Sequence, residues 1–133
     1  MTYDQLLEAL CLWRESRGQS AAAQAAILAV IRNRATDSRN RWPKTSAEVV
    51  TQPWQFSSFN ASDPNVTKWP TPKNAIEWAA WLQCCNIVET PLTADPTHGA
   101  TNYESLPPGM AKPGWADEAE LTTKIGPFSF YKL

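Results

Sequence analysis

The sequence of 133 residues has few of the residues from which metal, nucleotide and serine-hydrolase sites are built. It contains one histidine, His98, and three cysteines, an odd number without a C-x-x-C pair. This set fits neither a disulfide framework nor a zinc site, so we expect reduced thiols and no metal. The chain also lacks Gly-rich phosphate loops and the G-x-S-x-G motif. We therefore expect no cofactor and neither nucleotide chemistry nor a serine-hydrolase triad.

Clustered charge and long apolar runs are also scarce. The net charge is −1, and lysines and arginines are spread from Arg14 to Lys132, which argues against nucleic acid as a partner. No apolar run approaches the roughly 18 residues of a membrane span. The first residues have neither the basic nor the apolar segment of a signal peptide, so we expect synthesis in the cytoplasm without one.

Apolar residues are nevertheless sufficient for one folded domain. They make up 43% of the chain against 19% charged residues, a balance typical of globular proteins. A chain of 133 residues also suits a single hydrophobic core. We therefore expect one domain over residues 1–133, with a monomer as the default.

Capping residues and apolar periodicity predict helices at residues 3–17, 21–35, 46–52 and 72–90. Gly18 is expected to end the first helix in a left-handed conformation. Thr71 is the predicted cap of the last helix, with Pro72 in its first position. The broad apolar face of this helix predicts that it is the central one; its members are Ile76, Ala79, Ala80, Leu82, Cys84, Ile87 and Val88.

Strands are expected only in the last third of the chain. Residues 95–99 predict a turn before an extended segment at 100–105, and Gly126-Pro127 separates two short apolar runs that predict a hairpin. The chain is therefore predicted to be α+β and mainly helical, with a small hairpin or sheet.

Seven tryptophans in so short a chain require an explanation. Trp13, Trp78 and Trp81 are expected to pack inside as helix residues. The other four, Trp42, Trp54, Trp69 and Trp115, are expected in loops. Exposed indole faces suit the apolar faces of sugars, although packing is an equally good account of any single loop tryptophan.

Glu15 is the first candidate for chemistry, because it lies between two predicted helices and directly after Trp13 and Arg14. A carboxyl group under aromatic cover at such a junction can act as a general acid. The simpler interpretation is a solvated carboxylate paired with Arg14, Arg17 or Arg34. His98 has a similar alternative as an ordinary turn or groove residue.

Five motifs occur in one order along the chain: Glu15-Ser16-Arg17-Gly18, Val30-Ile31-Arg32-Asn33-Arg34, Gln55-Phe56-Ser57, Asp95 to Tyr103, and Ile125 to Tyr131. In this order the chain resembles the cell-wall hydrolases of the spore-cortex-lytic (SleB-like) type. The resemblance extends over nearly the whole chain. It departs from many relatives at Trp13-Arg14, where they have Tyr-Gly, and at Gln19, where they have an acidic residue.

The resemblance implies a lysozyme-like α+β domain that cleaves the bond between N-acetylmuramic acid and N-acetylglucosamine in peptidoglycan. It implies a lytic transglycosylase in which Glu15 is the general acid and base. It also implies that substrate contacts come from Gln55, Phe56, Ser57, Thr101, Asn102 and Tyr103; Trp54 and His98 are further candidates for the groove. Such a domain without a signal peptide is similar to a phage endolysin, which reaches the wall after release by a separate pore or by lysis.

Three alternatives remain at the level of the sequence. A muramidase would hydrolyse the same bond with a second carboxylate, for which Asp63, Asp95, Glu104 and Asp117 are the candidates. A glycan-binding module would use the loop aromatics without Glu15. A helical interaction protein would use neither.

Overall fold

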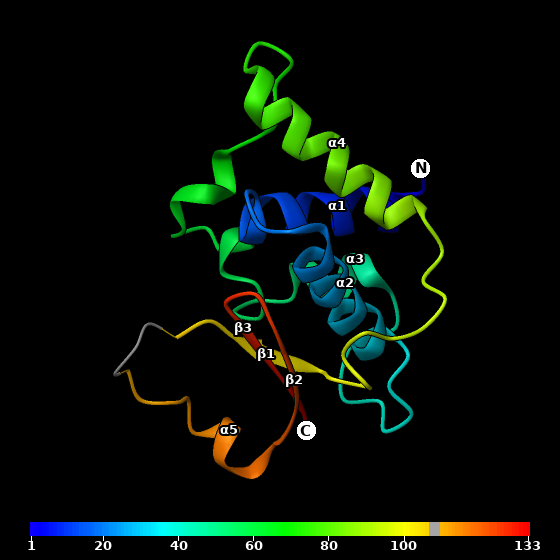
Figure 1. Ribbon diagram of the computed structural model, residues 1–133, viewed down its shortest axis with the longest axis vertical. Helices are drawn as coiled ribbons and strands as arrows, with labels where there is room; N and C mark the ends of the chain where they lie inside the picture. The colour runs from blue at the N-terminus through cyan, green and yellow to red at the C-terminus, as the bar shows by residue number, and fades with distance from the viewer. Residues whose placement is uncertain (107–109) are drawn as a thin grey trace.

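The computed structural model describes residues 1–106 and 110–133 of the chain. Helices form the first two thirds and a small sheet forms the last third (Figure 1). In chain order the elements are α1 (Tyr3–Ser16), α2 (Ala21–Ala35), α3 (Ser46–Thr51), the 3-10 turns η1 (Ser57–Phe59) and η2 (Pro64–Thr67), α4 (Ala75–Glu89), β1 (Asn102–Glu104), α5 (Trp115–Glu118), β2 (Glu120–Ile125) and β3 (Phe128–Lys132). The expected mainly helical α+β fold is confirmed.

The first helices begin where their capping residues predict. The Thr2 side chain accepts from the backbone N–H of Gln5, and the Gln5 side chain accepts from that of Thr2, which completes a capping box. The Ser20 side chain caps α2 by accepting from the backbone N–H of Ala23. Gly18 between the two helices has φ 86°, a left-handed conformation that favours glycine. This turn carries the chain from α1 directly into α2.

The last long helix begins later than predicted. Asn74, not Thr71, is the N-cap of α4, and its side chain accepts from the backbone N–H of Glu77 at 3.1 Å. The Thr71 carbonyl instead accepts from the backbone N–H of Asn74, which closes a turn ahead of the helix. Asparagine is a stronger N-cap than threonine, and the two candidate caps are three residues apart, so the helix begins at the stronger one.

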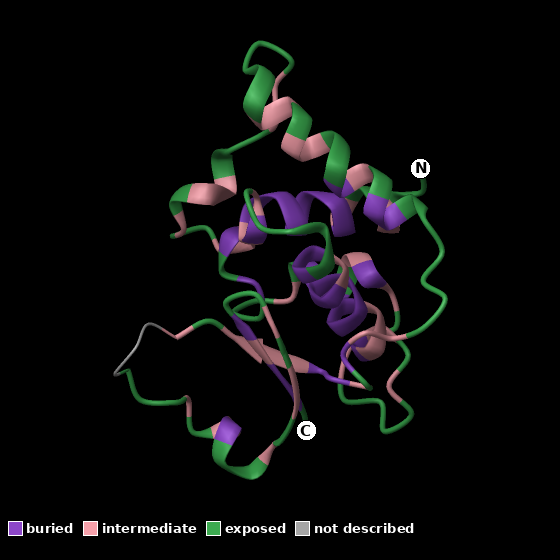
Figure 2. Ribbon diagram, viewed as in Figure 1, coloured by how far each residue is buried: buried purple, intermediate pink, exposed green. Residues whose placement is uncertain are grey.

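The predicted central position of this helix is also wrong, because α2 occupies the centre. Nine of the residues of α2 are buried, whereas α4 buries only Cys84, Ile87 and Val88. Ile76 is 84% exposed and Leu82 is 52% exposed. Figure 2 shows α1 and α2 largely buried and α4 largely open to solvent. The alanines of α2 let other helices approach it closely, which a sequence count of large apolar residues does not reveal.

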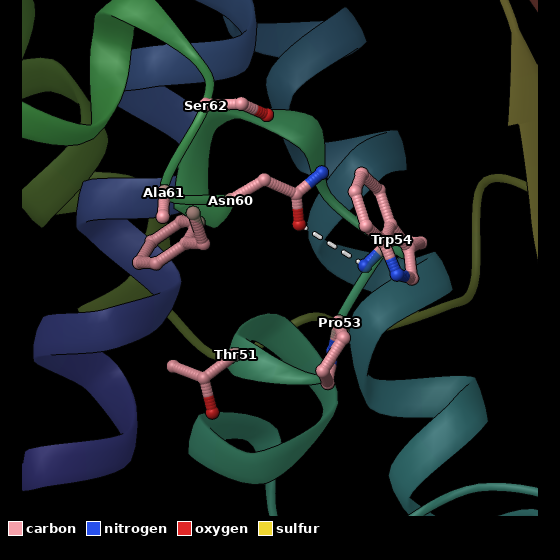
Figure 3. Close-up of a pocket in the computed structure, with 7 residues that line it drawn as sticks. Thr51, Pro53, Trp54, Asn60, Ala61 and Ser62 are labelled. Atoms are coloured by element: carbon pink, nitrogen blue, oxygen red, sulfur yellow. Dashed lines mark hydrogen bonds between the residues drawn. The ribbon is translucent and has the colours of Figure 1, made fainter.

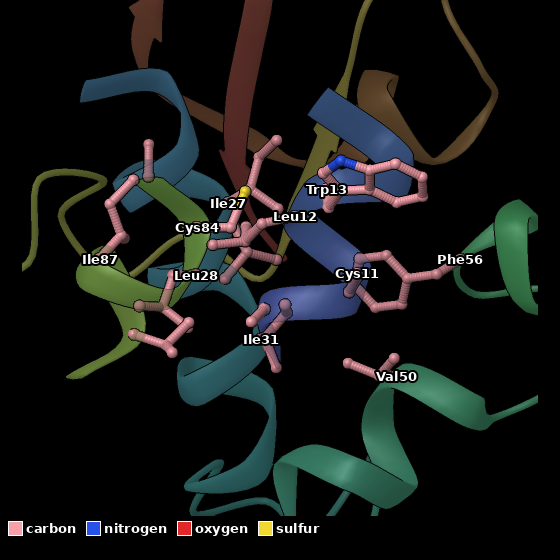
Figure 4. Packing of buried hydrophobic residues seen from close by; sticks show 14 of the residues in the cluster. Cys11, Leu12, Trp13, Ile27, Leu28, Ile31, Val50, Phe56, Cys84 and Ile87 are labelled. Atoms are coloured by element: carbon pink, nitrogen blue, oxygen red, sulfur yellow. The ribbon is translucent and has the colours of Figure 1, made fainter. Parts of the chain in front are cut away.

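Side chains from four helices meet in one core (Figure 4). Trp13, the largest fully buried side chain, comes from α1, and Ile27, Leu28 and Ile31 come from α2. Two cysteines, Cys11 and Cys84, are buried in the core and Cys85 is half-buried, all as free thiols. Cys11 and Cys84 therefore act as small apolar side chains of the core.

The three strands form an antiparallel sheet in the order β1-β3-β2. Gly126 (φ 58°) and Pro127 form the turn between β2 and β3, which confirms the predicted hairpin. Trp115 lies in α5 and not in a loop as expected, and its ring packs edge-on against Tyr131 at 5.2 Å. No helix in the described part of the chain is long and apolar enough to cross a membrane.

Candidate active site

Glu15 lies in the last turn of α1 and is half-buried. One of its carboxylate oxygens, Oε1, accepts a hydrogen bond of 3.2 Å from the backbone N–H of Ser58. Ser58 belongs to η1, directly after the Gln55-Phe56-Ser57 motif. This hydrogen bond therefore joins the first motif to the residue that directly follows the third motif.

Arg14, the neighbour of Glu15, is buried and bonds backbone carbonyls rather than the carboxylate. Its guanidinium donates to the carbonyls of Val66 at 2.9 Å, Lys68 at 3.2 Å and Ser58 at 3.5 Å. It also lies over the rings of Phe59 and Trp69, at 4.9 and 4.8 Å from their centroids. Burial lowers the pKa of Arg14. This side chain fastens the segment 58–69 to the end of α1.

The other two arginines that the sequence offers as partners of Glu15 are also engaged elsewhere. Arg17 stacks on Trp13 at 4.4 Å and donates to the Asn65 side chain at 3.4 Å. Arg34 is buried and donates to the Thr101 carbonyl at 2.6 Å and to Gln55 Oε1 at 3.2 Å. The carboxylate of Glu15 is thus not held in an ion pair by the partners that the simpler interpretation requires.

Arg34 connects two segments. One is the loop that carries Gln55, and the other is the backbone at Thr101, directly before strand β1. The Arg34 guanidinium lies 5.4 Å from the centroid of Phe56 and 5.3 Å from that of Trp42. Burial lowers the pKa of Arg34 to about 10, so the group remains a cation at neutral pH. Sequence reasoning named Arg34 as one possible ion-pair partner of Glu15 but did not predict its bonds to Thr101 and Gln55.

Tyr103 on β1 faces the same region from the side of the sheet. Its ring contacts Phe56 at 6.4 Å, Phe128 at 5.6 Å and Phe130 at 5.9 Å. Burial raises the pKa of the Tyr103 hydroxyl well above its ordinary value; the Glu15 carboxylate raises it further, and the Arg34 guanidinium acts in the opposite direction. The phenol therefore stays protonated and lies within the electrostatic field of Glu15.

The predicted substrate-contacting residues differ in exposure. Gln55 and Ser57 are exposed, and Asn102 and Tyr103 are half-buried. Phe56 and Thr101 are buried, at 2% and 5% exposure, so their side chains support the loop and the strand from within.

Trp54 and His98 lie at more exposed positions. Both are exposed residues with positive φ, 67° and 54°. Trp54 is at the start of the loop that carries Gln55, and it lines a cavity next to α3. His98 is in the turn at residues 95–99, and its neighbour Gly99 lines another cavity with Arg39 and Lys132.

Asp95 holds that turn in shape. Its two carboxylate oxygens accept from the backbone N–H and hydroxyl of Thr97, the Asn33 side chain and the backbone N–H of Gly99, at 2.7 to 2.8 Å. Burial of the carboxylate raises its pKa, but the four hydrogen bonds outweigh this and lower the pKa overall. Asn33 also donates to the Ala100 carbonyl at 2.9 Å, so α2 fixes the path into β1.

The remaining candidates for a second carboxylate are scattered. Asp63 caps η2 by accepting from the backbone N–H of Asn65 at 2.8 Å. Glu104 accepts from the Tyr131 hydroxyl at 3.0 Å, and Asp117 is exposed on α5. Within residues 1–106 and 110–133, no group of three or more His, Cys, Asp or Glu side chains lies close enough together to hold a metal ion.

Comparison with known proteins places this arrangement in a family. Two solved structures resemble it over almost the whole chain. The catalytic domain of the Bacillus cereus SleB protein is 30% identical, with a TM-score of 0.67, and the match covers 97% of this chain and 89% of that one. The catalytic domain of the germination-specific lytic transglycosylase SleB from Bacillus anthracis is 28% identical, with a TM-score of 0.68, and the match covers 99% of this chain and 97% of that one.

A search of curated proteins finds no match. The family model for cell wall hydrolases matches residues 18–131, a stretch that begins three residues after Glu15 and includes the other four motifs. The chain belongs to the cell wall hydrolase family.

Proposed function

We propose that this protein is a peptidoglycan lytic transglycosylase with Glu15 as its general acid and base. The observation that carries the proposal is the position of Glu15: its half-buried carboxylate is held by the Ser58 backbone N–H, while the nearby arginines bond other groups. A carboxyl group free of a paired cation can take up a proton and donate it to a leaving group. The Bacillus anthracis relative is a lytic transglycosylase, which supports the same reaction for this chain.

The proposed reaction needs one carboxyl group on the protein. Protonated Glu15 gives its proton to the glycosidic oxygen, and the bond from that oxygen to C1 of N-acetylmuramic acid breaks. The 6-hydroxyl of the same sugar then attacks C1 and loses its proton to the Glu15 carboxylate. The result is a 1,6-anhydro end, with no water consumed. The proposed substrate contacts are Gln55 and Ser57 on the loop and Tyr103 on β1, with Phe56 and Thr101 behind them. The Asn102 side chain lies on the opposite face of β1 from Tyr103.

Hydrolysis is the second candidate, and Glu104 is the residue that would favour it. Its Oε2 atom is buried without a hydrogen-bond partner among the described residues. Glu104 follows Tyr103 on β1, however, and successive side chains on a strand point to opposite faces. The Glu104 side chain therefore lies on the opposite face of β1 from the Tyr103 phenol, whose pKa the Glu15 carboxylate raises.

The test is mass spectrometry of the soluble fragments that purified peptidoglycan releases. We expect wild type to give anhydromuramic ends and Glu15→Gln to be slower by about 100- to 10,000-fold, the usual contribution of a general acid. Glu89→Gln, the same substitution at an exposed residue at the end of α4, is the matched control. Circular dichroism of all three proteins should be the same.

Other outcomes would contradict the proposal in specific ways. Reducing ends from wild type would indicate hydrolysis, with Glu104 as the next residue to replace. Equal rates for wild type and Glu15→Gln would exclude Glu15 as the acid. No fragments from several wall types would favour the glycan-binding module.

A further inference from the structure

A cavity of about 310 Å³ opens between the end of α3 and the segment that follows η1 (Figure 3). Trp54 and Phe59 supply its aromatic surface, and Thr51, Asn60 and Ser62 supply polar groups. Trp54 is 78% exposed, the most exposed tryptophan among the large apolar residues of the described chain. An indole left open to water beside a cavity is a surface on which a ligand can stack.

Trp54 is held in this position by the backbone. Its φ of 67° is in the left-handed region, which a bulky residue rarely adopts. Its backbone N–H donates to Asn60 Oδ1 at 3.0 Å, a hydrogen bond that joins the two ends of the segment 54–60 (Figure 3). The side-chain amide of Asn60 therefore fixes the turn that presents the indole.

The chemistry of the cavity suits an N-acetylated sugar. The apolar face of a pyranose ring can lie on an indole, while its hydroxyl and acetamido groups need hydrogen-bonding partners. With Oδ1 of Asn60 bonded to Trp54, its amide nitrogen is left to donate, and the Ser62 hydroxyl can donate or accept. No lining side chain ionises near neutral pH, so a neutral ligand fits better than the charged stem peptide.

The loop connects this cavity to the catalytic region. Residue by residue, Trp54 lines the cavity, Gln55 bonds Arg34, Phe56 packs inside, and the Ser58 backbone N–H bonds Glu15. Trp54 and Ser58 are four positions apart in the chain, so their Cα atoms are at most about 14 Å apart. One glycan strand of several sugars can span such a distance.

We infer that this cavity is a subsite for an N-acetylhexosamine of the glycan strand, away from the bond that is cleaved. The inference rests on the proposed function, because it assumes that the strand passes Glu15. Trp54 and Asn60 then determine how firmly the enzyme holds a long strand. They take no part in the proton transfer itself.

The experiment measures binding separately from cleavage. The Glu15→Gln protein is sedimented with purified peptidoglycan, alone and with a second substitution, Trp54→Ala or Tyr3→Ala. Tyr3 is 65% exposed at the start of α1 and serves as the matched aromatic control. We expect Trp54→Ala to weaken binding about 10-fold, the loss of one stacked aromatic contact, and Trp54→Phe to recover part of it.

Two outcomes overturn the inference. The first is unchanged affinity in the Trp54→Ala protein, measured beside the Tyr3→Ala control. The second concerns the ligand. We expect a peptide-free N-acetylglucosamine hexamer to displace peptidoglycan from the Trp54-dependent site. Displacement only by peptide-bearing fragments would exclude a sugar subsite. Fragment release by Glu15→Gln, recorded in the same samples, tests the acid role of Glu15 alone.

Discussion

Arg14 occupies the position before the proposed acid, and its three hydrogen bonds go to the backbone of the segment 58–69. The same segment begins with Ser58, whose N–H bonds Glu15. We therefore expect Arg14 to position Glu15 through the loop and not through its own charge. Arg14 stands where many relatives have glycine, so these three hydrogen bonds come from a side chain that those relatives lack.

Arg14→Lys should slow the reaction without unfolding the protein. Lysine keeps the charge, but its three N–H donors all lie on one nitrogen, so it cannot reproduce the planar fork with which three separate nitrogens of Arg14 reach three carbonyls. A misplaced acid commonly costs up to about 100-fold in rate. We expect kcat to fall by about 10- to 100-fold with a smaller change in KM, measured on soluble glycan strands.

Arg17→Lys is the control for this effect. Arg17 also follows the end of α1, but its bonds are long, at 3.4 Å, and one of them is to the Trp13 carbonyl of its own helix. Equal losses of kcat in both variants would mean that any change at this helix end slows the enzyme. A drop in the thermal midpoint that parallels the loss of rate would indicate a structural role for Arg14.

At single residues, the sequence predicted which segments meet but not which side chains are buried or what they bond. The co-linear motifs led to Glu15 and to the two segments that meet near it. They did not distinguish exposed members such as Gln55 from buried ones such as Phe56, because burial depends on contacts from distant segments. For the same reason the roles of Arg34 and Asn33, which bond residues more than sixty positions away, had no signal in the local pattern.

Among the elements, helix boundaries were predictable where a second signal supported the cap. Thr2 forms a capping box with Gln5, Ser20 directly precedes a run of alanines, and α1 and α2 begin there. Thr71 and Asn74 compete, and the pattern favoured the wrong one. The position of a helix in the molecule was harder to predict, because large apolar residues on α4 look like core residues until their solvent exposure is known.

Two isoleucines on different helices test this difference. Ile31 on α2 is fully buried, and Ile31→Ala should lower the free energy of unfolding by about 2–5 kcal/mol through the cavity it leaves. Ile76 on α4 is 84% exposed, and Ile76→Ala should stay within about 0.5 kcal/mol of wild type. Urea unfolding of both variants measures the comparison. A large loss at Ile76 would mean that another surface covers this face of α4 in solution.

At the scale of the whole molecule, α2 connects the helical part to the sheet. Asn33 bonds Asp95 and the Ala100 carbonyl, and Arg34 bonds the Thr101 carbonyl just ahead of β1. These contacts set the position of Tyr103 relative to Glu15. The sequence predicted the helices and the hairpin separately, but the polar contacts that hold them together depend on side chains that meet only in the folded chain.

Asp95 makes this connection sensitive to acid. Hydrogen bonds lower the pKa of its carboxylate below the ordinary 3.8, so the folded state favours the charged form. The resulting stabilisation is complete at pH values above 3.8 and is lost as the pH falls through the lowered pKa. Wild type should therefore lose part of its stability in this acidic range through the turn at residues 95–99.

Asp95→Asn should remove that part of the pH dependence. In this variant an NH2 group replaces one carboxylate oxygen that accepted hydrogen bonds, so two donors face each other. At neutral pH this costs about 1–3 kcal/mol of unfolding free energy. The difference from wild type should shrink as the pH falls, because wild-type Asp95 then becomes protonated and neutral as well. Urea unfolding between neutral pH and pH 3 gives both curves, with Asp117→Asn on the exposed face of α5 as the control. A difference that stays constant over this range would show that the charge of Asp95 does not stabilise the connection between α2 and the sheet.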